Sequence, residues 1–214
     1  MSTLVSDNVS VILPEGIAEE VVKVDTGSDG TDQVAVSEPV AELDFDLTGA
    51  TEFSGSAISK SEITVKADQN ESTKVTVDSN FKQNTINNDG SGSLEVSINQ
   101  SNFRKSTIDA GDKKRDDLIA FKGSSTVIKS DVALGKGNDT ITFSKATKFK
   151  GKTTVDLGKG GKDSIVLKPN SLKKGKLVIT NFTKKDTITV GKETFTFKDF
   201  KNGAEIPGIK IKFA

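Results

Sequence analysis

A repeat of about 23 residues constrains this chain more than any other feature. Four segments share the pattern Asp-x-Ile-x-apolar, and their first residues, Asp117, Asp139, Asp163 and Asp186, are 22, 24 and 23 residues apart. An apolar pair at alternate positions precedes each segment: Ile108/Ala110, Val132/Leu134, Val155/Leu157 and Leu177/Ile179. A large apolar residue lies five or six positions before each pair: Phe103, Val127, Phe149 and Leu172. Phe81 with Ile86, and Phe53 with Ile58, are candidates for extending the series upstream.

One such unit is too small to bury its own apolar face, so neighbouring units have to stack. The repeat therefore predicts an all-β chain that forms a parallel β-solenoid of ~23-residue rungs with β caps. At ~4.8 Å per rung, six rungs would be about 29 Å tall. Ile119, Ile141, Ile165 and Ile188 should form one buried column, and Phe121, Phe143, Leu167 and Val190 a second. A β-sandwich built from the same strands is the alternative.

The flanking segments divide the chain into three predicted parts. Residues 1–50 are expected to form an acidic N-terminal β cap or small β module, residues 51–190 the solenoid and residues 191–214 a C-terminal β cap. Apolar residues at alternate positions, as in Leu43, Phe45 and Leu47, are typical of half-buried strands. The only helical spacing lies between Pro14 and Val24.

Composition excludes several kinds of chemistry. The chain has no His, Cys, Trp or Tyr, so histidine-based nucleophile systems and ordinary zinc, haem and iron–sulfur sites lack their side chains. Ca²⁺, which prefers oxygen ligands, stays possible. We therefore predict no catalytic residues, no required cofactor and no enzymatic activity. A polysaccharide-acting β-helix enzyme is a distant alternative, because such enzymes can work with Asp, Lys and Arg alone, although sugars usually stack on Trp or Tyr.

Two of the turns resemble a known family. Residues 134–142, Leu-Gly-Lys-Gly-Asn-Asp-Thr-Ile-Thr, resemble the haemolysin-type (RTX) calcium-binding nonapeptide, and residues 158–166 are similar. The resemblance extends at most over residues 103–190. It implies that turn carbonyls and the carboxylates of Asp139, Asp163, Asp117 and Asp186 would hold Ca²⁺ between adjacent turns. The family's tandem repeats take 18 residues per turn, its turns are richer in glycine, and its members are usually acidic.

A structural role for these aspartates is the other interpretation, since Asp beside Gly commonly accepts hydrogen bonds from its own turn. Glu42, Asp44 and Asp46 are similarly placed on one expected strand face and could bind a cation. A solvated outer face is the simpler interpretation of that triplet.

Charge is divided between the two halves of the chain. Residues 1–100 carry 5 basic and 18 acidic side chains, and residues 101–214 carry 25 basic and 12 acidic ones, a net charge of −13 against +13. Only two of the basic residues are Arg, and the Phe side chains are expected to point inward, so specific nucleic-acid binding is not predicted. The lysine-rich half could instead contact an anionic surface.

The longest apolar run, residues 118–121, is far too short to span a bilayer, and the N-terminus lacks the pattern of a secretory signal peptide. Together these features predict a structural protein that joins other proteins or copies of itself in a virion or on a cell surface, such as a capsid-decoration or tail-associated component. An exported RTX-like calcium-binding protein or adhesin module is the alternative.

Overall fold

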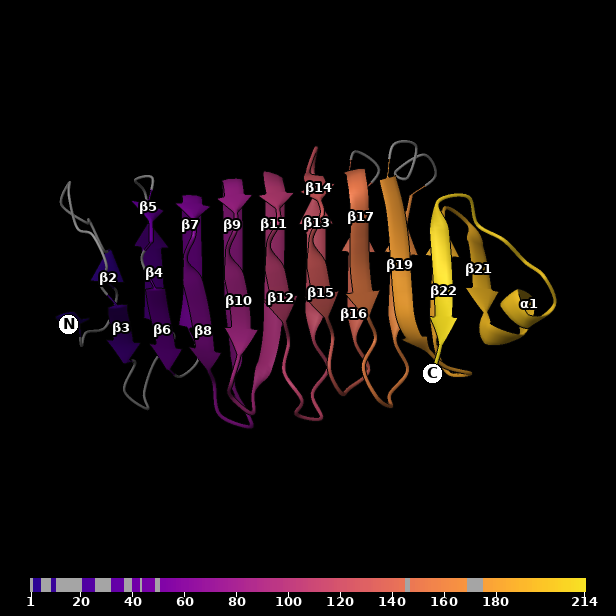
Figure 1. The fold of residues 1–214 in the computed structure, drawn as a ribbon. Coiled ribbons are helices and arrows are strands. Elements are labelled where there is room, and N and C mark those ends of the chain that lie inside the picture. Colours follow the sequence, from indigo (N-terminus) through magenta and orange to yellow (C-terminus); the bar gives the residue numbers. More distant parts are fainter. Residues whose placement is uncertain are drawn as a thin grey trace.

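The chain folds into a parallel β-solenoid, and 62% of the residues that the structure describes are in strands and 3% in helix. A computed structural model describes residues 2–4, 9–10, 21–25, 32–36, 40–42, 44–48, 51–144, 147–168 and 175–214. Successive turns follow one another along a single axis, with the two chain ends at opposite ends of the body (Figure 1). The predicted solenoid is therefore confirmed, and the β-sandwich is excluded by the parallel pairing of strands from successive turns.

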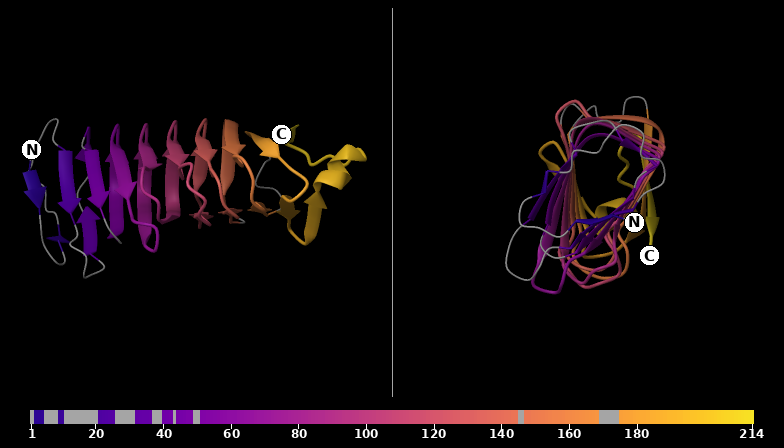
Figure 2. Two further views of the ribbon diagram at one scale, coloured as in Figure 1. Left: turned by 90° about the horizontal axis from the view of Figure 1, so that it is seen from below. Right: turned by 90° about the vertical axis from the view of Figure 1, so that its left-hand side faces the viewer.

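Two parallel sheets wrap around the core, which lies inside the closed outline seen along the axis (Figure 2). Sheet A runs from the N-terminal to the C-terminal end in the order β1 (Ser2–Leu4), β3 (Val21–Asp25), β6 (Asp44–Thr48), β8 (Glu62–Lys66), β10 (Thr85–Asn88), β12 (Thr107–Asp109), β15 (Asp131–Ala133), the second half of β17 (Lys148–Asp156), β19 (Gly175–Phe182) and β22 (Ile209–Phe213).

Sheet B covers the rest of each turn and bends once on the way. Its strands are β2 (Val9–Ser10), β4 (Asp32–Val36), β5 (Val40–Ala41), β7 (Thr51–Ser59), β9 (Ser72–Lys82), β11 (Ser93–Arg104), β13 (Leu118–Lys122), β14 (Thr126–Ile128), β16 (Thr140–Phe143), the first half of β17, β18 (Ser164–Leu167), β20 (Thr187–Val190) and β21 (Glu193–Thr196). The bend falls where Ser79, Gln100 and Gly123 have positive φ.

The core consists of residue columns that run along the axis. Ile119, Ile141, Ile165 and Ile188 pair in register and are fully buried, as predicted. Phe121 pairs with Phe143, and Leu167 with the half-buried Val190. A third column contains Ile58, Phe81, Phe103, Val127 and Phe149. Because each side chain packs against its equivalents on both neighbouring turns, apolar burial is continuous from turn to turn.

In two places the predicted alignment of residues between successive units is wrong. Ile58 is the partner of Phe81, so Phe53 and Ile58 are not a unit equivalent to Phe81 and Ile86. At the other end, Val155 pairs with Ile179 and Thr153 with Leu177, which shifts the last apolar pair by two residues. The turns that follow these pairs differ in length, so the distance to the next aspartate did not indicate the correct alignment.

Strand β3 begins at Val21, so the helical spacing between Pro14 and Val24 does not produce a helix over residues 21–24, and residues 14–20 lie outside the described part. The described strands of residues 1–50 pair in parallel with those of residues 51–66. Leu43 and Leu172 also lie outside the described residues.

A short helix that the sequence did not predict closes the C-terminal end of the core. Strand β21 pairs antiparallel with β20, and α1 (Phe197–Lys201) follows directly, started by a capping box between Thr196 and Asp199. The ring of Phe200 lies edge-on to buried Phe182, with ring centres 5.5 Å apart. The helix therefore covers apolar side chains that a further turn of the solenoid would otherwise bury.

Candidate functional site

The four predicted aspartates form one ladder at the corner where sheet A leads into sheet B. Each is at least 97% buried. The Oδ1 atom of Asp139 accepts a hydrogen bond from the backbone N–H of Asp117 at 2.9 Å, and Asp163 and Asp186 accept equivalent bonds at 2.9 and 3.0 Å. Asp117 accepts the N–H of Leu94 at 2.6 Å. Each aspartate thus binds the backbone of the preceding turn of the solenoid. The structural interpretation of the sequence had predicted a bond within the aspartate's own turn, which Asp186 forms in addition.

The second carboxylate oxygens are less well satisfied. The Oδ2 atoms of Asp117 and Asp139 are buried and have no hydrogen-bond partner among the described residues. Asp186 differs, because its Oδ2 accepts bonds from the N–H and the hydroxyl of Thr183. A buried carboxylate oxygen without a donor is costly while the group is charged, and far less so once it is protonated.

Burial accordingly raises the pKa of Asp117, Asp139 and Asp163, each to about 7. The backbone N–H bonds oppose this rise in pKa, and the neighbouring aspartates, including Asp116, add to it by like-charge repulsion. Three of the four ladder carboxyl groups, those of Asp117, Asp139 and Asp163, thus change charge near neutral pH.

Two further corners carry the same hydrogen-bond arrangement with neutral side chains. Asn84, Ser106 and Ser130 each accept the N–H of the preceding turn, from Ser61, Asn84 and Ser106. Ser125 does the same for Ser101 at 3.3 Å. The sequence analysis missed these residues, although their spacing of 22 to 24 matches that of the aspartates. These neutral side chains show that the backbone N–H at a corner needs an oxygen as its acceptor, and that the acceptor need not be charged.

Glycines in the turns before the aspartates allow adjacent turns to approach closely. The N–H of Lys159 donates to the carbonyl of Gly135 at 3.2 Å. Gly161 has φ +93°, and a Cβ there would overlap the carbonyl oxygen of Gly137 on the preceding turn. The carbonyls of Arg115 and Gly137 thus point along the axis toward the glycine of the next turn.

Substituting one of these glycines tests the close approach. Gly161→Ala should lower the free energy of unfolding by about 2 kcal/mol or more, because both φ and the Gly137 carbonyl oppose a side chain. Gly160 is the matched control, since its φ is +88° but nothing lies within 4 Å of a Cβ there. Gly160→Ala should cost only about 1 kcal/mol, the penalty for φ alone. Equal losses in urea unfolding would contradict the stacking of these turns.

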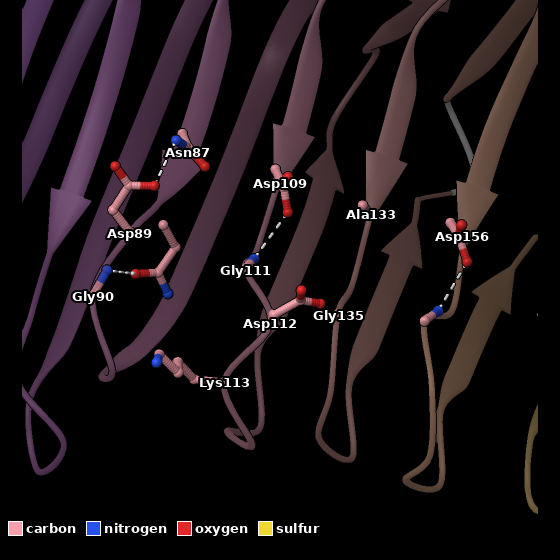
Figure 3. A pocket seen from close by; sticks show the side chains of 12 residues that line it. Asn87, Asp89, Gly90, Asp109, Gly111, Asp112, Lys113, Ala133, Gly135 and Asp156 are labelled. Carbon is pink, nitrogen blue, oxygen red and sulfur yellow. Dashed lines mark hydrogen bonds between the residues drawn. The ribbon is translucent and has the colours of Figure 1, made fainter.

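A groove of about 420 Å³ runs past the carboxyl ends of β10, β12, β15 and β17 of sheet A, beside these turns (Figure 3). Its acidic side chains include Asp89, Asp109, Asp112 and Asp156. Asp109 and Asp156 each accept the N–H of the glycine two residues later, at 3.0 and 2.9 Å. These are the own-turn bonds that the sequence predicted for the ladder. Because the carboxylates of Asp109 and Asp156 bind the backbone in this way, they stabilise the turns that line the groove.

The triplet at residues 42–46 does not share one strand face. Asp44 and Asp46 project outward from β6, whereas Glu42 lies before the strand with φ 61° and forms an ion pair with Lys60. Asp46 pairs with Lys66 at 2.8 Å, and Glu52 with Lys74 at 2.7 Å. All three ion pairs join adjacent turns near the N-terminal end of the described chain.

The ladder offers Ca²⁺ little of what it requires. Ca²⁺ takes six to eight oxygen ligands, but every ladder Oδ1 already accepts an N–H and two of the nearby carbonyls point toward glycines. Among the residues that the structure describes, no group of three or more acidic side chains is placed to hold a metal ion. Calcium binding therefore stays a prediction that depends on the two free Oδ2 atoms.

Comparison with known proteins leaves the fold as the basis for classification. No protein-family model, curated protein or solved structure matches the chain. Its architecture places it in the class of parallel β-solenoids. In the described part of the chain, no helix has the length and apolar character needed to cross a membrane.

Proposed function

We propose that this chain is a non-catalytic structural component of a virion or cell-surface assembly, such as a capsid-decoration or tail-associated protein, which acts by presenting a rigid β surface. The observation that carries the proposal is an uncharged face on the outside of sheet B, which we call the threonine face. It consists of two in-register columns: Leu118, Thr140, Ser164 and Thr187, and Ala120, Thr142, Val166 and Thr189, of which Ala120 is itself buried.

This face differs from the rest of a chain in which 28% of residues are charged. Leu118, at 39% exposure, is the only large exposed apolar side chain among the described residues. The columns repeat every ~4.8 Å along the axis on a backbone fixed by the isoleucine column behind it. A flat, regular and uncharged surface of this kind suits contact with another ordered protein surface.

Mass spectrometry of fractions from the source tests the proposal. We expect the protein in purified particles or in the cell-surface fraction, and recovery only from the soluble intracellular fraction would contradict the proposal. A tagged Val166→Lys variant should be depleted from the particles or the cell-surface fraction, because it places a charge in the centre of the threonine face. The matched control is Asn102→Lys, which adds the same charge on the outside of β11.

An exported calcium-binding protein is a second candidate, and the free Oδ2 atoms of Asp117 and Asp139 favour it. A ligand that binds only the folded state raises the melting temperature. We nevertheless expect little change when Ca²⁺ or a chelator is added, because the Oδ1 atoms of the ladder already accept backbone N–H groups without a metal. A rise of more than a few degrees that is lost in Asp139→Asn and Asp163→Asn would favour this second candidate instead.

A further inference from the structure

The outward face of sheet A carries acidic and basic side chains at opposite ends. Near the N-terminal end, β6 and β8 present Asp44, Asp46 and Glu62, together with Lys66, which pairs with Asp46. At the C-terminal end, β17, β19 and β22 present four exposed lysines: Lys152, Lys176, Lys210 and Lys212. The face between them holds Thr, Asn and Ala together with Asp109, Asp131 and Asp156.

The four lysines line a groove of about 490 Å³ over Val178. None of them belongs to an ion pair in the described part of the chain, in contrast to the lysines at positions 60, 66 and 74. Lys152 and Lys176 are direct cross-strand partners, and like charges in that position repel each other. The groove therefore lacks an anionic partner among the described residues of its own chain.

The acidic side chains that complement this groove lie at the N-terminal end of sheet A, in the same residue columns along the axis. Strand register connects Asp44, Glu62, Thr85, Thr107, Asp131, Thr154, Val178 and Lys210 in one column. The column that begins at Asp46 runs two residues further along each strand, and Lys212 lies two residues beyond Lys210 on β22. If two copies face each other with opposed axes, β22 of one lies over β6 of the other.

We propose that sheet A is the surface of an isologous dimer, in which a second copy lies antiparallel and places Lys210 and Lys212 over the partner copy's Asp44 and Asp46. Two-fold symmetry forms this contact twice. The same overlay brings Thr85 opposite Thr154, and Thr107 opposite Asp131, so that no two acidic side chains of this column oppose each other. The proposal rests on the proposed function insofar as the molecule acts by joining surfaces.

The groove itself favours a second copy over a nucleic acid. Neither Arg nor an aromatic side chain lines it, so bases would find neither a bidentate donor nor a ring on which to stack. The acidic residues of β6, in contrast, match the spacing of the lysines because both pairs are two residues apart on a strand.

Charge reversal followed by mixing tests the dimer. Light scattering of the full chain at low salt should give a dimer mass that returns to the monomer mass near half-molar salt, where the screening length is only about 4 Å. Lys210→Glu with Lys212→Glu, or Asp44→Lys with Asp46→Lys, should each weaken dimerisation roughly tenfold or more. An equimolar mixture of the two variants should recover the dimer, because both contacts then pair opposite charges.

Lys148→Glu with Lys150→Glu is the matched control, since it makes the same charge change on sheet B. This control should dimerise normally. A monomer at low salt, an unaffected double variant or a failure of the mixture to recover would overturn the proposal. A mass that grows beyond the dimer would indicate head-to-tail stacking and would also overturn it. None of these results would affect recovery of the protein in particles, so the proposed function is tested separately.

Discussion

In calcium-free buffer the protein should be more stable at pH 5 than at pH 8, by about 2–4 kcal/mol in its free energy of unfolding. The folded-state pKa values of Asp117, Asp139 and Asp163 are about 7, whereas an unfolded Asp has a pKa of about 3.9. Between these values the folded chain binds more protons than the unfolded chain. Stability is therefore lost as pH rises from about 4 to about 7, and this contribution is constant at higher pH.

Asp139→Asn should remove part of this dependence and stabilise the protein at pH 8. The amide oxygen can still accept the N–H of Asp117, as the Asn84 side chain does at its own corner. Asp112→Asn, at an exposed position in the same region, is the control and should leave the pH profile unchanged. Urea unfolding at a series of pH values measures both. Stability that rises from pH 5 to pH 8 would show that the ladder is ionised in the folded protein.

Ile141→Ala should lower the free energy of unfolding by about 2–5 kcal/mol, because it opens a cavity in a fully buried column. Ile141 contacts the column both above and below, through its partners Ile119 and Ile165. The loss should appear as a lower denaturant midpoint with an unchanged slope.

Thr140→Ala is the matched control for this substitution. Thr140 is the adjacent residue on β16 and faces outward in the threonine face. Its replacement should change stability by less than about 0.5 kcal/mol. Similar losses from the two substitutions would mean that β16 does not direct Ile141 inward.

The regular strands were the part of the fold that could be predicted from sequence. Ile119 and its equivalents each follow an aspartate by two residues. The alternation of apolar and polar residues placed Thr140 and Thr142 on the outer face. The alignment was wrong at Leu177, because turns of different length separate the apolar pairs from the aspartates. Turn length depends on how adjacent turns of the solenoid pack, and that contact involves two distant segments.

The candidate site was predicted less completely than the fold. The four aspartates are in one ladder, as their common spacing indicated, but their partners are backbone groups one turn away. Ser106 and Ser130 gave no comparable signal, because isolated serines are frequent in this chain. Helix α1 is only five residues long, and its first residue, Phe197, continues the alternation that begins at Phe195 on β21, as it would in a strand.

The hydrogen bonds that the corner side chains accept from backbone N–H groups all have the same direction along the axis. In each ladder the N–H belongs to the earlier turn and the side-chain oxygen to the later one, as for Asp117 with Asp139 and for Ser106 with Ser130. During synthesis from the N-terminus, the corner donors of each turn have no partner until the following turn is in place. Loss of C-terminal turns leaves these buried N–H groups unsatisfied, which is costly. Loss of N-terminal turns has a similar cost, because it removes carbonyls that accept from the next turn, such as the Asp117 carbonyl for the N–H of Thr140. A shortened solenoid consequently exposes unpaired backbone groups at whichever end is cut, and each new end would need a cap.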